Sequence, residues 1–221
     1  MATVLILIIN ISTTEIILFE RFNSEVNHHI IYQSVTIILA ILVLLVLRFS
    51  RKETFLQFFR IGNLGASIKP ERLVGINPKS NETWRQFGRN IVIIITLVTA
   101  IVMYFQTVKK NEIVFYDVLE IFPFALIFAI SNSFVEESIT RLGVVVSLYG
   151  NVSDKTIQIT SAIIFGVIHY WGSPGGIIGV IVAGFLGWFL AKSIIETRGI
   201  FWAWLTHFLQ DVIIFSVILI Y

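Results

Sequence analysis

Long apolar stretches occupy most of the 221-residue chain and limit its fold more than any other feature. A helix needs roughly 20 mostly apolar residues to cross the hydrocarbon core of a bilayer. The stretches that approach this length are Thr3–Phe19, Ile30–Leu47, Asn90–Phe105, Val114–Val135, Thr156–Trp171, Gly175–Ile195 and Ile200–Tyr221. Hydrophobic residues make up 56% of the chain, and one soluble core could not bury so much apolar surface. The sequence therefore predicts an all-α, multi-pass helical bundle in the cell membrane.

The number of membrane helices depends on two segments. No Lys or Arg precedes Arg21, so we interpret Thr3–Phe19 as a retained span rather than a cleaved signal peptide. The apolar stretch Leu142–Tyr149 either extends the fourth helix or forms a short separate one. We therefore expect seven to eight transmembrane helices around a central polar cavity.

The only long polar segment, residues 48–89, is strongly basic. It contains nine Lys and Arg residues against three Glu. By the positive-inside rule this segment faces the cytoplasm, where it can contact anionic lipid. Alternation of the spans then places Glu20–His29 and Gln106–Glu112 on the outer side of the membrane.

The composition excludes several classes of function. The chain has no cysteine, which rules out disulfides, a thiolate nucleophile and a Cys-based metal site. The net charge is only +2, which gives no basis for binding nucleic acid through bulk charge. The Gly-x-Ser-x-Gly turn of many serine hydrolases is also absent.

Ionisable side chains within the apolar stretches are the candidates for function. Inserting each one at the bilayer centre costs roughly 2.5–3.5 kcal/mol, so such residues persist only where they are paired, solvated or functional. Glu136, Glu137 and Arg141 lie at the end of the fourth stretch. Glu137 and Arg141 are four residues apart, so they share a helix face and can neutralise each other. Glu136 is rotated about 100° away and remains available, unless the group is only an ion cluster at the lipid interface.

Two histidines and an aspartate lie in the later stretches. His169 follows Phe165 by four residues near the end of the fifth stretch, where it is either functional or an interfacial residue. His207 and Asp211 are four residues apart within the last stretch and share one face at membrane depth. The alternative role for this second pair is a hydrogen bond between helices that only stabilises the bundle.

The ordered set Glu-Glu-x-x-x-Arg, Phe-x-x-x-His and His-x-x-x-Asp, on separate membrane helices, resembles the CAAX protease and bacteriocin-processing family. This family includes the prenyl-protein endopeptidase branch and bacterial Abi members. The segment Glu196–Trp202 ahead of His207 is similar to the usual lead-in to that histidine. The resemblance covers roughly Phe122–Asp211 and implies an intramembrane glutamic endopeptidase.

The resemblance also implies roles for the residues in these patterns. Glu136 and His169 would hold and activate the attacking water, and His207 and Asp211 would stabilise the oxyanion. A carboxylate in a low-dielectric cavity is suited to general-base catalysis near neutral pH. Asp211 stands where many members have Asn, so it is either protonated or orients His207 while His207 donates.

By the same resemblance, Glu137 and Arg141 would brace the site. We expect a single transmembrane domain over residues 1–221. Within it, residues 1–112 supply the N-terminal spans and the basic cytoplasmic loop, and residues 113–221 supply the catalytic core helices.

The membrane topology sets a geometric condition on this site. Strict alternation of spans places Glu136 near the cytoplasmic end of the fourth helix and His169 near the outer end of the fifth. The two can meet if the fourth helix continues through Leu142–Leu148 and bends near Pro123. We then expect a water-filled cavity about halfway down the bundle, open toward the cytoplasm.

Other chemistries remain open. The two histidines and two of the acids are zinc ligands by type, but no His-Glu-x-x-His spacing exists, so we expect catalysis without a metal or other cofactor. A non-catalytic membrane immunity or scaffold protein would bind a peptide in the same cavity, and a small transporter would use the buried acids as a proton relay. The expected partners are the lipid bilayer and a peptide or membrane-protein substrate, with or without a lipidated C-terminus.

Overall fold

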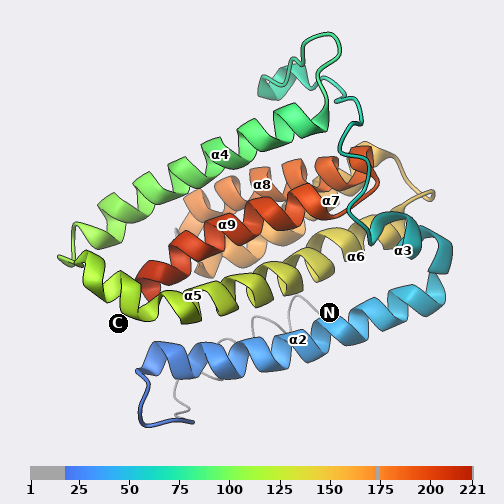
Figure 1. The fold of residues 1–221 in the computed structure, drawn as a ribbon. Helices are drawn as coiled ribbons and strands as arrows, with labels where there is room; N and C mark the ends of the chain where they lie inside the picture. Colours follow the sequence, from blue (N-terminus) through green and yellow to red (C-terminus); the bar gives the residue numbers. More distant parts are fainter. Residues whose placement is uncertain (1–17, 173–174, 221) are drawn as a thin grey trace.

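The computed structural model describes residues 18–172 and 175–220, and within these ranges the chain is helical, with isolated β-bridges but no strand. The long helices lie roughly side by side in one bundle, and a longer loop leads from α3 to α4 (Figure 1). This arrangement confirms the predicted all-α membrane bundle. The α-helices are α2 (Ser24–Ser50), α3 (Lys52–Phe58), α4 (Trp84–Met103), α5 (Phe115–Glu136), α6 (Gly143–Leu148), α7 (Asp154–Ile168), α8 (Gly176–Thr197) and α9 (Phe201–Ile218).

Five helical segments of the described chain are long and apolar enough to cross a membrane. They are Ser24–Ser50, Trp84–Val108, Phe115–Leu148, Gly176–Thr197 and Phe201–Ile218. Large hydrophobic side chains are exposed along α2, α4 and α8, as lipid contact requires. The chain is therefore a multi-pass membrane protein.

The predicted count of seven to eight spans is not reached within the described residues. The stretch Thr156–Trp171 forms α7 and a 3₁₀ turn at His169–Trp171, and α7 has only 15 residues. The stretch Thr3–Phe19 lies outside the described residues except for its last two. The remaining five predicted stretches each correspond to one of the five long segments.

Two of these helices begin earlier than the apolar pattern predicts. Helix α2 starts at Ser24, because the Asn23 side chain caps it by accepting a hydrogen bond from the Val26 N–H at 2.8 Å. Helix α4 starts at Trp84, inside the segment predicted to be a polar loop. Hydrophobicity marks the part of a helix that is in lipid, whereas a cap marks where the helix begins.

The fourth predicted helix continues past its apolar stretch. Helix α5 passes through a π-helical segment, Glu137–Leu142, directly into α6. The interpretation of Leu142–Tyr149 as an extension, rather than a separate helix, is thus confirmed. The π-helical segment is a wider turn, a feature that is frequent at functional sites, and it contains Glu137 and Arg141.

Helices α7 and α8 pack closely through glycines. A Cβ atom at Gly166 would lie 2.7 Å from the backbone oxygen of Val180, and one at Gly187 would lie 3.0 Å from the Cβ of Phe165. These contacts bring the α7 backbone against α8 and fix the position of Phe165. Helix α5 packs in the same extended way along α9.

The long loop between α3 and α4 is fixed to the turn between α8 and α9. The buried side chains of Lys192 and Glu196 form an ion pair. Lys192 also donates to the Lys69 carbonyl at 2.8 Å, and Glu196 accepts from the indole N–H of Trp84 at 2.9 Å. In addition, the Ile200 N–H donates to the Arg60 carbonyl at 2.9 Å. The loop therefore sets where α9 begins.

We expect Gly166→Ala to destabilise the protein, because the new methyl group would meet the Val180 backbone and force α7 away from α8. Overpacking of this kind costs about 1–3 kcal/mol. Thermal unfolding in lipid nanodiscs should show a lower midpoint for this variant. Gly65→Ala is the matched control, since its Cβ would lie 3.4 Å from a flexible Asn63 side chain. Equal midpoints for the two variants would contradict the close α7–α8 contact.

Candidate active site

Two acids from the end of α5 and two residues of α9 meet inside the bundle. Glu136 and Glu137 come from the α5 side, and His207 and Asp211 come from α9. The exposed fraction of the side chain is 14% for Glu136, 0% for Glu137 and 7% for each of the α9 residues. Protein atoms therefore largely cover this cluster, and the water-filled cavity expected around it stays a prediction.

His207 lies between three carboxylates. Its Nδ1 is 2.8 Å from Oε1 of Glu137, and since an ionised carboxylate can only accept, this nitrogen carries the proton. Its Nε2 is 3.5 Å from Oδ1 of Asp211 and 3.8 Å from Oε2 of Glu136. The ring is thus oriented by Glu137, and Nε2 faces the other two acids. The family resemblance allowed this orienting role for Asp211 as one of two alternatives, and it implied only a bracing role for Glu137.

Arg141 completes the buried ion pair that its spacing predicts. Its Nη1 is 3.0 Å from Oε1 of Glu137, and both side chains are fully buried. The same nitrogen donates to Thr140 Oγ1 at 2.8 Å. The guanidinium carbon lies 3.3 Å from the centre of the Phe165 ring, a cation–π contact. Arg141 therefore links the acids of α5 to helix α7.

His169 lies at the end of α7, on the other side of Phe165. Its Nδ1 is 2.9 Å from the Phe165 carbonyl, which can only accept, so Nδ1 carries the proton and Nε2 is free to accept. The Phe165 ring centre is 4.1 Å from that of His169 and 5.8 Å from that of His207. Glu136 is close enough to act electrostatically on His169. The structure thus places both imidazole rings against one phenylalanine, and the Glu136 carboxylate lies beside the His207 ring.

The conflict in depth between Glu136 and His169 is resolved by helix length. The fourth membrane helix extends to Leu148, so Glu136 lies within it rather than at its end. Pro123 lies inside α5, where a bend was predicted. Helix α7, by contrast, ends at Ile168.

Sequence reasoning missed two amides of this cluster. The Asn132 amide donates to Oε1 of Glu136 at 3.2 Å and to Oδ2 of Asp211 at 3.0 Å. Gln33, on α2, donates to Oδ1 of Asn132 at 3.2 Å. Asn132 precedes Glu136 by four residues within an apolar run, and this spacing was the available signal. Nothing in the sequence pairs Gln33 with it.

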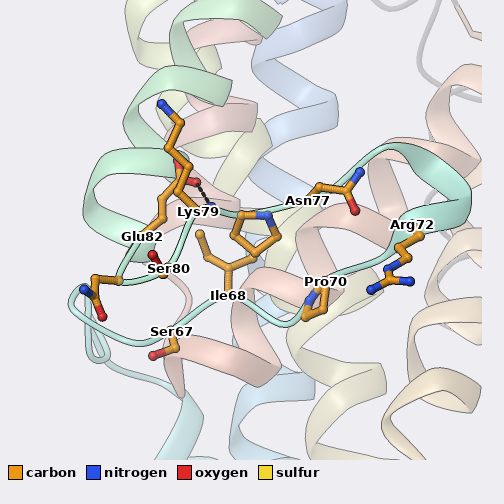
Figure 2. Close-up of a pocket in the computed structure, with 10 residues that line it drawn as sticks. Ser67, Ile68, Pro70, Arg72, Asn77, Lys79, Ser80 and Glu82 are labelled. Carbon is orange, nitrogen blue, oxygen red and sulfur yellow. Dashed lines mark hydrogen bonds between the residues drawn. The ribbon is translucent and has the colours of Figure 1, made fainter.

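The predicted absence of a cofactor remains a prediction. Among residues 18–172 and 175–220, no three His, Asp or Glu side chains are arranged to hold a metal ion. A separate hollow of about 530 Å³ lies in the loop before α4, where Arg72 and Lys79 line it together with Pro70 and Glu82 (Figure 2). No residue of the carboxylate and histidine cluster lines this hollow.

We expect Arg141→Met to lower stability strongly, because it leaves the buried Glu137 carboxylate without its cation. Breaking a buried pair in this way costs about 3–5 kcal/mol. Lys69→Met is the control, since the Lys69–Asp154 pair is exposed and such pairs contribute about 0–1 kcal/mol. Thermal unfolding in nanodiscs compares the two variants. Similar midpoints would show that the Glu137–Arg141 pair does not stabilise the core.

Residues 117–213 match the family model described as Rce1-like, type II CAAX prenyl endopeptidase Rce1-like. No curated protein and no solved structure matches the chain. The matched range contains every residue of the three sequence patterns, and it excludes α2 and α4. Over residues 117–213, which are 97 of its 221 residues, the chain is therefore similar to the Rce1-like family of CAAX prenyl endopeptidases.

Proposed function

We propose that this protein hydrolyses a peptide bond of a membrane-anchored substrate, with a water molecule that Glu136 activates. One observation carries the proposal. Oε2 of Glu136 is buried, has no hydrogen-bond partner and lies 3.8 Å from Nε2 of His207. A buried acceptor without a partner is costly, and it calls for a group that completes it. The attacking water is such a group.

His169 is suited to hold the same water. Its Nδ1 proton is engaged by the Phe165 carbonyl, so Nε2 can accept a hydrogen bond. A water that donates to Glu136 and to His169 would keep its oxygen lone pair for attack. Two fixed acceptors orient the nucleophile, which removes part of the entropic barrier to reaction.

The proton balance of the reaction follows from these contacts. As the water oxygen bonds to the substrate carbonyl carbon, Glu136 takes one water proton and the carbonyl oxygen becomes an oxyanion. A doubly protonated His207 would donate a hydrogen bond from its Nε2–H to that oxyanion. Glu136 then delivers its proton to the leaving nitrogen as the C–N bond breaks, which regenerates the carboxylate.

Asp211 acts in this scheme as an acceptor. Its Oδ2 accepts from the Asn132 amide at 3.0 Å, and its Oδ1 is 3.5 Å from Nε2 of His207. A carboxylate in this position can balance the positive charge of a doubly protonated His207 ring. Of the two roles considered from the sequence, the contacts favour support of His207 over direct donation to the oxyanion.

The substrate class rests on the family description. A CAAX prenyl endopeptidase acts on a prenylated protein near its C-terminus, and we propose the same class here. The lipid of such a substrate would keep its peptide at the membrane, which is where the cluster lies. A bacteriocin-processing role is the other proposal that the sequence raised, and it uses the same chemistry on a different peptide.

We expect Glu136→Gln to reduce hydrolysis by about 10²–10⁴-fold, because the amide cannot accept the proton of the water. Release of C-terminal fragments from farnesylated and unlipidated quenched peptides, in vesicles that contain the purified protein, measures this. Glu120→Gln is the matched control, since Glu120 is an exposed acid on the same helix. Unchanged hydrolysis by Glu136→Gln would end the proposal. Peptide binding without turnover by the wild type would favour a scaffold.

A further inference from the structure

A line of side-chain amides joins α2 to the carboxylates of the cluster. Gln33 donates to Asn132, and the Asn132 amide donates to Glu136 and Asp211, at distances of 3.2, 3.2 and 3.0 Å. Gln33 is 3% exposed and Asn132 is 7% exposed, so water does not readily replace these bonds. Gln33 also lies outside residues 117–213, the range that the family match covers.

The carboxylates of Glu136 and Asp211 share the same two neighbours, the Asn132 amide and the His207 ring. Glu136 directs Oε1 to the Asn132 amide, and Asp211 directs Oδ2 to it. The other oxygen of each acid, Oε2 of Glu136 and Oδ1 of Asp211, faces Nε2 of His207. Asn132 therefore fixes the rotation of both carboxylates, and with it the direction of the oxygen that is proposed to take the water proton.

This function of Asn132 depends on which way its side-chain amide points. A side-chain amide has a donor end and an acceptor end of nearly the same shape, and a flip exchanges them. In the flipped state, the Asn132 carbonyl oxygen would face two carboxylates and repel both. The Gln33 N–H stabilises the working state, because it donates to the acceptor end of the amide, Asn132 Oδ1.

We propose that Gln33 is a positioning residue of the active site, which acts by keeping the Asn132 amide directed at Glu136 and Asp211. The proposal rests on the proposed hydrolysis and deepens it. It makes α2 a part of the catalytic unit rather than only a membrane span. Gln33 touches neither the proposed water nor the peptide, so its effect must pass through Asn132.

The test is the pH dependence of Gln33→Glu, a substitution of almost the same shape. A protonated Glu at position 33 can donate to Asn132 Oδ1, whereas an ionised one cannot and instead attracts the Asn132 amide. The ratio of kcat between variant and wild type should therefore fall as pH rises, by about tenfold between the protonated and ionised forms. KM should change little, because the substrate does not contact position 33. A ratio that is constant with pH would overturn the proposal.

Gln33→Glu is also combined with Asn132→Ala, to separate an effect that passes through Asn132 from a direct effect of the new charge. In Asn132→Ala, Gln33→Glu should cause no further pH-dependent loss, because the residue through which it acts is gone. A pH-dependent loss that persists there would show that the new charge acts directly on Glu136, and it would overturn the proposal. Gln33→Leu, which cannot donate at any pH, should lower kcat about tenfold with no trend in the ratio.

Gln210→Glu is the matched control. Gln210 also forms a 3.2 Å side-chain hydrogen bond between helices, from α9 to Thr99 on α4, and it has no bond to the cluster. Its kcat ratio should be constant with pH, and unfolding midpoints confirm that each variant is folded. If the wild type and Glu136→Gln hydrolyse the two peptides equally, the proposed function fails. If only Glu136→Gln is inactive and Gln33→Glu follows the wild type at every pH, the inference on Gln33 alone fails.

Discussion

The rest of the site depends on the two contacts of the Glu137 carboxylate, with Arg141 and with His207. Its Oε1 lies 3.0 Å from Nη1 of Arg141 and 2.8 Å from Nδ1 of His207, and its side chain is fully buried. Removing an ion from water costs several kcal/mol, which a partner recovers only with good geometry and further hydrogen bonds. Oε1 of Glu137 accepts from both partners, so the group that neutralises Arg141 also joins the end of α5 to α9. Glu137 and Arg141 thus hold the helices together, and the proposed catalytic role of Glu136 does not require it to do so.

The sequence predicted the fold class because apolar length alone decides which segments cross a bilayer. It failed at the ends of helices, where hydrophobicity carries no information. The Asn23 cap starts α2 before the predicted apolar stretch, and Trp84 starts α4 in a segment that contains nine basic residues. It also predicted more spans than the five that residues 18–172 and 175–220 contain. Leu142–Leu148 continues an existing helix, and α7 has only 15 residues.

For the site, spacing within one helix was informative and contacts between helices were not. The four-residue spacing of Glu137 and Arg141 predicted an ion pair that the structure contains. The bond from His207 to Glu137, and the one from Gln33 to Asn132, depend on how helices distant in sequence pack. In the sequence, such a contact is indicated only by a polar residue within an apolar stretch. Asn132 is such a residue, but the sequence does not show which residues of α2 and α9 contact it.

Unequal helix lengths explain how the polar residues reach one depth. The segment Phe115–Leu148 has 34 residues, which at 1.5 Å each is about 51 Å, well beyond a hydrocarbon core of roughly 30 Å. Glu136 is therefore far from either end of it. Helix α7 has 15 residues and spans about 22 Å by the same measure, so it is too short to cross the hydrocarbon core. His169 follows directly after α7 and is half-buried. Two full-length spans would have placed the acid and the histidine at opposite surfaces of the membrane.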